Sequence, residues 1–270
     1  MQASLVKYTR YTANTFVVVG LLMFAINIIG LFDYTTIDGD EIENISDHPR
    51  TVSEQAFWAD AYRREGESVK DYSDRLTALI EGRMIAIDPK FSRPTFFENW
   101  ILWARGQRRG YHEWLDTKRA VRLGGGYCSQ HAIVFDNLLD EQGIESRILG
   151  LSGHVINEVL IDNKWKVFDP NYNVVFDESL SELERNPQHV YQAYLDAGYG
   201  EGTARNWQEV YGTPENNFHF RNSQSYSSTI YLIFEKLALK LIWFIPAFLL
   251  VTGLLARLWL AREDSQAGDA

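Results

Sequence analysis

Cysteine is nearly absent from this sequence: Cys128 is the only one among 270 residues. A single cysteine cannot form an intrachain disulfide, and zinc sites built from several thiolates are excluded as well. Basic residues are also in the minority, with 26 Lys and Arg against 36 Asp and Glu and a formal net charge of −10. Nucleic-acid binding needs a basic face that neutralises phosphates, so this balance argues against nucleic acid as the main partner.

Long apolar runs, by contrast, occur at two places, although the mean hydropathy of the whole chain is only −0.24. The first run, residues 16–32, contains no charged residue and a single amide, Asn27. Its length lies at the lower end of what spans a bilayer. A cleaved signal peptide is the alternative, but no small-x-small cleavage site follows, so we expect an uncleaved transmembrane helix.

The second apolar run covers residues 241–256 and extends to Leu260. Within it, Arg257 can reach the interface by snorkelling, and Pro246 is tolerated because bilayer helices accommodate a kink. A buried core helix is the alternative interpretation. Basic residues flank the run on both sides: Lys236, Lys240 and Arg262. These flanks favour a transmembrane helix.

Charges beside the two runs predict their orientation. Lys7 and Arg10 precede the first run, and acidic residues follow it: Asp33, Asp38, Asp40, Glu41 and Glu43. The positive-inside rule therefore places the N-terminus in the cytoplasm, and a second span returns the C-terminus to the same side. We expect a cell-membrane protein with two spans whose middle domain lies outside the cytoplasm, in the periplasm.

Composition and periodicity divide the chain into successive segments. They are a cytoplasmic N-terminus (1–15), a transmembrane helix (16–32), an acidic linker (33–50), a helical subdomain (51–123), a core with a following helical segment (124–225), a juxtamembrane segment (226–240), a transmembrane helix (241–260) and a cytoplasmic tail (261–270). In the helical subdomain, Ser53 and Ser68 are the predicted N-caps. The aromatic residues 186–212 are expected to be helical and to cover one side of a cleft or to connect to the second span.

Cys128 lies in the stretch GGGYCSQHA, residues 124–132, at the start of a predicted helix that Gly143 closes. Free N–H groups and the helix dipole favour an anion there, and the thiolate is the nucleophilic form of cysteine. The glycines are expected to leave room for a substrate backbone. The N–H of Cys128 is a candidate oxyanion donor.

An antiparallel meander of three strands is predicted after this helix: residues 146–151, 154–161 and 164–170. If Ile161 pairs with Lys164, Asp169 becomes a diagonal neighbour of His154 on the same face. A carboxylate beside an imidazole fixes its tautomer and supports the imidazolium. Cys128, His154 and Asp169 therefore form a candidate nucleophile, base and orienting residue.

Each residue of this set also has an ordinary structural explanation on its own: a buried cysteine, a satisfied strand histidine, and a turn aspartate before Pro170. Their combination and order favour a catalytic triad. A metal site made of His154, Glu158 and Asp169 is the weaker alternative, because no second histidine is suitably spaced. His131 lies one helical turn after Cys128, and we expect it to pack or to support the site.

These stretches resemble the transglutaminase-like superfamily. The resemblance rests on a glycine-aromatic-Cys-x-x-x-Ala helix start, GIESR at 143–147, a strand that opens on His154, and WKVFDP at 165–170, all within residues 120–176. It implies an α+β fold with a papain- or transglutaminase-like core, in which the helix bearing the cysteine packs on an antiparallel sheet. Here that core is flanked by N- and C-terminal transmembrane helices.

The resemblance also implies the roles of the site residues: Cys128 as nucleophile, His154 as general base and acid, and Asp169 as orienting residue. Ile156 stands where members often carry a tryptophan, whereas Glu158 matches a common acidic position. The second oxyanion donor of the family lies upstream, and the candidates here are Trp114 and Tyr127. No cofactor is expected, and no recognisable calcium-binding loop is present in the sequence.

The sequence thus predicts a membrane-anchored cysteine hydrolase or acyltransferase that cleaves an amide or ester bond through an acyl-thioester on Cys128. Its substrate is expected to be a protein or peptide-like molecule, with water or an amine as the acceptor. The alternative is a catalytically silent transglutaminase-like binding or scaffold module, with partners in a membrane assembly that handles cell-surface polymers.

Overall fold

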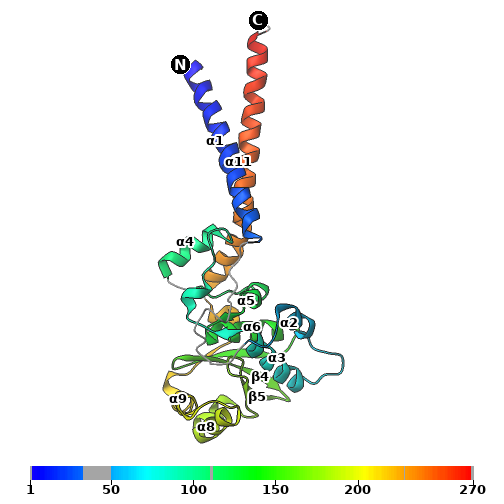
Figure 1. Cartoon of the computed structure of the whole chain (residues 1–270), viewed down its shortest axis with the longest axis vertical. Helices are drawn as coiled ribbons and strands as arrows, with labels where there is room; N and C mark the ends of the chain where they lie inside the picture. The colour runs from blue at the N-terminus through cyan, green and yellow to red at the C-terminus, as the bar shows by residue number, and fades with distance from the viewer. Residues whose placement is uncertain (1, 33–49, 110–111, 228, 269–270) are drawn as a thin grey trace. The chain divides into compact units, whose positions relative to one another are not determined.

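The computed structural model describes residues 2–32, 50–109, 112–227 and 229–268, which form two compact units (Figure 1). The first unit is Met1–Thr35, Pro94–Arg109 and Ile233–Ala270, and the second is Thr36–Arg93 and Gly110–Leu232. Residues 94–109 thus group with the terminal helices, although the sequence pattern placed them in the helical subdomain 51–123. Nearly all of the predicted acidic linker, residues 33–49, lies outside the described residues.

Two long helices dominate the first unit: α1 (Gln2–Gly30) and α11 (Thr229–Gly268). Their stretches Lys7–Gly30 and Ile230–Glu263 are long and apolar enough to cross a membrane, which confirms the predicted pair of apolar terminal helices. Both stretches are longer than the predicted spans, because the helices continue into the flanking residues. α11 continues through Pro246, where a helix loses one backbone hydrogen bond.

Small residues let α1 and α11 approach each other closely. A Cβ atom on Gly253 would lie 2.8 Å from the Ala13 carbonyl oxygen, and one on Gly20 would lie 2.8 Å from the Leu250 side chain. The Asn27 side chain donates a hydrogen bond to the Ile242 carbonyl. Small residues that allow backbone contact, together with one buried amide between helices, are typical of helix pairs packed within a bilayer.

In the second unit, helices precede the sheet in sequence. They are α2 (Glu54–Asp60), α3 (Val69–Arg83), the 3₁₀ turn η1 (Pro89–Ser92), α5 (Thr117–Leu123) and α6 (Cys128–Glu141). Ser53 and Ser68 cap α2 and α3 by accepting hydrogen bonds from Ala56 and Asp71, as the sequence predicts. Short parallel strands β1 (Ile85–Ala86) and β2 (Gly125–Gly126) tie the end of α3 to the segment before α6.

A five-stranded antiparallel sheet follows, in the order β6-β5-β4-β3-β7. Its strands are β3 (Ser146–Leu151), β4 (His154–Ile161), β5 (Lys164–Asp169), β6 (Val174–Val175) and β7 (Phe218–Phe220). Ile161 pairs with Lys164, which confirms the predicted register. Asp162 and Asn163 in the connecting turn have φ of 51° and 62°, and Asp and Asn adopt this left-handed conformation more readily than other residues that carry a side chain.

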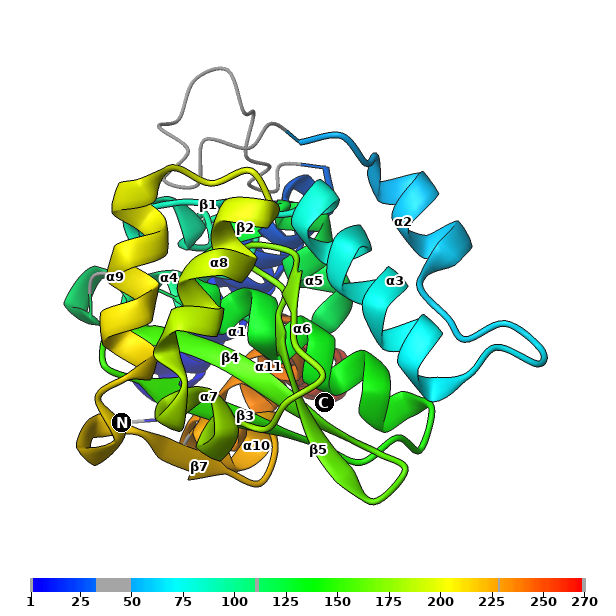
Figure 2. The same ribbon diagram turned by 90° about the horizontal axis from the view of Figure 1, so that it is seen from below.

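Helices cover both faces of this sheet (Figures 1 and 2). α6 packs on one face, where the rings of Phe135 and Phe168 lie 5.6 Å apart and Asn157 donates to the Ala132 carbonyl. α7 (Leu180–Arg185), α8 (Pro187–Asp196) and α9 (Glu201–Tyr211) cover the other face. The turn η2 (Pro214–Asn216) and the short helix α10 (Ser223–Tyr226) then lead to α11. The prediction of a mixed α+β fold with an antiparallel sheet is confirmed.

Candidate active site

The structure places the three predicted site residues at the ends of three different elements. Cys128 is the first residue of α6, His154 is the first residue of β4, and Asp169 is the last residue of β5. His154 Nε2 lies 2.6 Å from Asp169 Oδ2, and Cys128 interacts with the same imidazole and helps to raise its pKa. Since Nε2 is engaged by Asp169, Nδ1 is the ring nitrogen left for the thiol.

The aspartate is held by several donors. Besides the imidazole, the Asp169 carboxylate accepts hydrogen bonds from the Tyr194 hydroxyl and, at 3.1 Å, from the Asn171 N–H. Burial raises the pKa of Tyr194, so its hydroxyl stays protonated and remains a donor. A buried carboxylate with this many donors is oriented without any freedom to rotate away from the histidine.

The charge state of His154 depends on two opposing influences. Burial alone would lower the pKa of the imidazole, because only 1% of its surface is exposed and the cation loses hydration. The negative charge and hydrogen bond of Asp169, with the contact to Cys128, outweigh burial and raise the pKa of His154 to about 10. At neutral pH the imidazole is therefore a cation, and a cation beside a thiol favours the nucleophilic thiolate.

Aromatic side chains from the following helices enclose the imidazole. The Trp207 ring of α9 stacks on His154 with centroids 4.1 Å apart, and the Tyr172 ring lies edge-on at 5.7 Å. The predicted helical segment 186–212 therefore does cover this face. Sequence reasoning expected aromatic helices here, but nothing in the spacing indicated that Trp207 and Tyr194 contact the triad.

The glycines before Cys128 are needed for a reason other than the one predicted. Gly124 ends α5 with φ of 75°, and a Cβ atom there would lie 2.6 Å from the Arg50 guanidinium. A Cβ atom on Gly126 would lie 2.5 Å from the Gln130 side chain. Gly125 and Gly126 are buried and pair with β1. The space beside Gly124 and Gly126 is thus filled by the protein itself, which contradicts the expectation that these two glycines leave room for a substrate backbone.

The ring nitrogens of His131 face backbone carbonyl groups. Its ring nitrogens lie 2.9 Å from the carbonyl oxygens of Tyr127 and Met84, and the side chain is fully buried. Burial lowers the pKa of His131, and the carbonyl contacts oppose this only in part. The residue joins the start of α6 to the end of α3, which agrees with the expected supporting role.

The three candidate oxyanion donors, Cys128, Trp114 and Tyr127, differ in their hydrogen bonds and in their exposure. Cys128 occupies the first helical position, where the N–H has no carbonyl partner within the helix. The Trp114 backbone forms hydrogen bonds to the Gln130 amide in both directions, at 2.6 and 2.7 Å, and its buried ring packs against His112. Tyr127 is 45% exposed. The N–H of Cys128 is thus left without an intrahelical partner, whereas the Trp114 backbone is engaged by Gln130.

The carboxyl group of Glu113 lies against the residue that follows Cys128. Glu113 accepts a hydrogen bond from the hydroxyl of Ser129, the residue directly after Cys128. Burial raises the pKa of Glu113, with the Ser129 hydrogen bond opposing. Sequence reasoning missed this residue, because no periodic pattern connects it to the cysteine helix.

The metal alternative finds no support in the geometry. The Glu158 carboxylate is buried and accepts hydrogen bonds from Arg147 at 2.5 Å and from the Leu180 N–H at 2.7 Å, so it does not join His154. Within the described part of the chain, no group of three or more His, Cys, Asp or Glu side chains could hold a metal ion.

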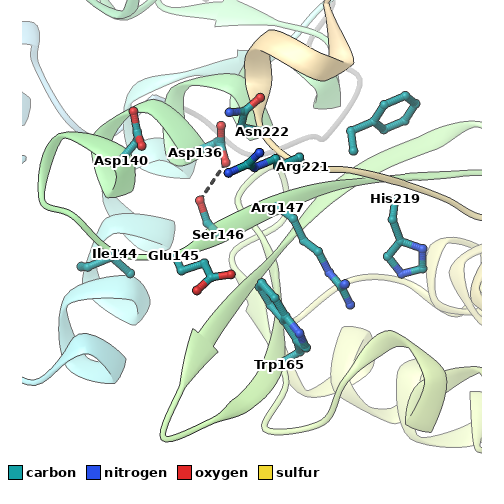
Figure 3. A pocket seen from close by; sticks show the side chains of 11 residues that line it. Asp136, Asp140, Ile144, Glu145, Ser146, Arg147, Trp165, His219, Arg221 and Asn222 are labelled. Carbon is teal, nitrogen blue, oxygen red and sulfur yellow. Dashed lines mark hydrogen bonds between the residues drawn. The ribbon is translucent and has the colours of Figure 1, made fainter.

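A cavity of about 570 Å³ lies elsewhere in this unit and includes no triad residue (Figure 3). Its lining includes residues of α6, β3, β5, β7 and the segment after β7, among them Asp136, Arg147, Trp165 and Arg221. Asp136 accepts a hydrogen bond from Ser146 across this lining.

Comparison with models of known families, with characterised proteins and with solved structures finds no match to this chain.

Proposed function

We propose that this chain is a membrane-anchored cysteine hydrolase or acyltransferase. The single observation that carries the proposal is the contact of one buried imidazole with both Asp169, at 2.6 Å, and the only cysteine of the chain. The resemblance to the transglutaminase-like superfamily supports the same roles and a papain-like core.

The residues allow a two-step reaction. The Cys128 sulfur attacks the carbonyl carbon of an amide or ester, and the carbonyl oxygen becomes an oxyanion that the Cys128 N–H can stabilise. His154 then gives its proton to the departing amine or alcohol, which leaves an acyl-thioester. In the second step water or an amine attacks the thioester carbon, His154 takes the proton, and the thiolate departs. Asp169 keeps the imidazole in one orientation throughout.

The two apolar helices support a location in the cell membrane. The flanking charges favour a cytoplasmic N-terminus, so that the second unit acts outside the cytoplasm. Reporters fused to the C-terminus test this orientation. We expect a reporter that works in the cytoplasm to be active, and activity confined to a periplasmic reporter would overturn the topology.

A thiol-directed acyl probe on native membranes tests the chemistry. We expect labelling of wild type and of a control variant, His189→Gln, whose histidine is exposed and pairs with Glu178 at the surface. Labelling should be lost in Cys128→Ser and in His154→Ala. Equal labelling of wild type and His154→Ala would refute the proposal. A Cys128→Ala chain that retains full function in cells would favour the binding or scaffold hypothesis.

A further inference from the structure

A cluster of exposed aromatic residues lies on the first unit. Phe96, Phe97 and Trp103 are 38%, 37% and 37% exposed. Their rings pack edge to face, with centroids 5.7 Å apart for Phe96–Phe97 and 5.3 Å apart for Phe96–Trp103. Exposed large apolar side chains are ordinary when scattered, whereas a contiguous group marks a contact surface.

The position of this aromatic cluster relates it to the membrane. The backbone of Phe97 abuts Gly30, the last residue of α1, so closely that a Cβ atom on Gly30 would collide with the Phe97 carbonyl. Gly30 is also the last residue of the apolar stretch Lys7–Gly30. The cluster therefore lies at the level where a spanning helix leaves the hydrocarbon and enters the headgroup layer, and Figure 1 shows α4 beside this end of α1.

The helix that follows the phenylalanines, α4 (Trp100–Arg109), has the composition of a membrane-surface helix. Its sequence WILWARGQRR contains three arginines and no acidic residue, in a chain whose net charge is −10. Leu102 is fully buried, and the Asn99 side chain accepts hydrogen bonds from the N–H groups of Ile101 and Leu102, which fixes the start of the helix. Aromatic residues combined with arginines suit the boundary between acyl chains and anionic headgroups.

We infer that the aromatic cluster and α4 form a third membrane contact, which lies in the headgroup region of the bilayer that α1 and α11 cross. The aromatic rings enter the acyl boundary, and the net positive charge of the α4 sequence favours anionic headgroups. This inference rests on the proposed membrane spans and is independent of the catalytic proposal. Because the chain enters this segment after Arg93 and leaves it before Gly110, the contact interrupts the sequence of the second unit.

An environment-sensitive label tests the inference on the full chain in liposomes. In a Cys128→Ser background, Phe97→Cys carries the fluorophore NBD, and Glu65→Cys, an exposed position in the second unit, is the matched control. We expect blue-shifted emission at position 97 that lipids with a shallow nitroxide quench and that aqueous iodide does not. Position 65 should behave in the opposite way. The effect at position 97 should be larger with phosphatidylglycerol than with phosphatidylcholine alone.

Two further measurements distinguish a failure of the proposed surface contact from a failure of the proposed membrane spans. If position 97 is as accessible to iodide as position 65 while the protein resists carbonate extraction, the spans stand and the surface contact is refuted. If carbonate extracts the protein, the proposed spans fail instead. Photoreactive phospholipids provide a second readout on the unmodified chain, with cross-links expected in residues 95–105, and an absence of such cross-links would also overturn the inference. Neither result depends on catalysis.

Discussion

Two buried histidines in the same unit differ in the charge of the groups that their ring nitrogens face. His131 and His154 are 0% and 1% exposed, and both rings have polar groups within hydrogen-bond distance. His131 faces two backbone carbonyls, and burial lowers its pKa. His154 faces a carboxylate and a thiol, which raise its pKa to about 10. Burial with neutral partners thus favours a neutral imidazole, and a buried negative partner favours a charged one.

Replacing Asp169, the negatively charged partner of His154, should make the pKa of His154 resemble that of His131. In Asp169→Asn, burial becomes the dominant influence, so the pKa of His154 should fall below the ordinary value of about 6.5. Probe labelling of Cys128 should fall by about 10³-fold or more, a loss of the size seen when other triads lose their aspartate charge. Histidine-selective NMR in nanodiscs follows the pKa, and a pKa near 10 in this variant would refute the assigned cause.

The stability of the two sites should depend on pH in opposite directions. The folded-state pKa of His154 is raised above the unfolded value, so its contribution is full below pH 6.5 and is lost as the pH rises toward 10. The folded-state pKa of His131 is lowered, so its contribution is present above pH 6.5 and is lost as the pH falls. Each slope is at most about 1.4 kcal/mol per pH unit.

Thermal unfolding in detergent at a series of pH values measures these slopes. We expect His154→Gln to flatten the decline between pH 6.5 and 10, and His131→Asn to flatten the decline below pH 6.5. An unchanged alkaline slope in His154→Gln would contradict the charged state assigned to this residue.

The Trp207 ring, which stacks on His154, should affect both the stability of the protein and the rate of labelling. Trp207→Ala removes a large and nearly buried ring, which should lower the free energy of unfolding by about 3 kcal/mol and open the imidazole to water. Trp207→Phe keeps a stacking ring and should lose less than half of that amount. Urea unfolding of both variants, with labelling rates measured well below the midpoint, separates the loss of stability from the loss of reactivity. Identical labelling by the Ala and Phe variants would exclude a role of the stack in reactivity.

The smallest effect on reactivity is expected at His131. His131→Ala leaves the Met84 carbonyl without its imidazole partner and should cost about 2 kcal/mol of stability. Labelling of the folded protein should change by less than about 10-fold, since the His131 ring nitrogens face only backbone carbonyls and the hydrogen bond between His154 and Asp169 is kept. A loss as large as that of Asp169→Asn would show that the two histidines do not differ as described.

Sequence patterns predicted this site through local rules. Strand alternation and a two-residue turn fixed the register of Ile161 with Lys164, and this register brings Asp169 to His154. Serine caps and apolar periodicity likewise located α2 and α3. Each of these features depends on residues close together in the chain, where backbone geometry leaves few alternatives.

The remaining features depend on contacts between distant segments, which no local pattern encodes. The stack of Trp207 on His154 joins residues that lie 53 positions apart in the sequence (207 − 154). The sequence predicts that Gly126 leaves room for a substrate backbone. The Gln130 side chain fills that space instead, and this contact exists only once the helix has folded. Residues 94–109 were assigned by position to the helical subdomain 51–123, whereas the structure groups them with α1 and α11.

The most direct test of the central claim is the rate at which the only thiol of the chain reacts with iodoacetamide at pH 6. Any alkylation reports Cys128 alone, because no other cysteine exists. If the His154 cation activates the thiol, the native chain should react at least about 10-fold faster than the urea-unfolded chain, and Asp169→Asn should abolish that excess. A native rate at or below the unfolded rate, unchanged in Asp169→Asn, would contradict the account.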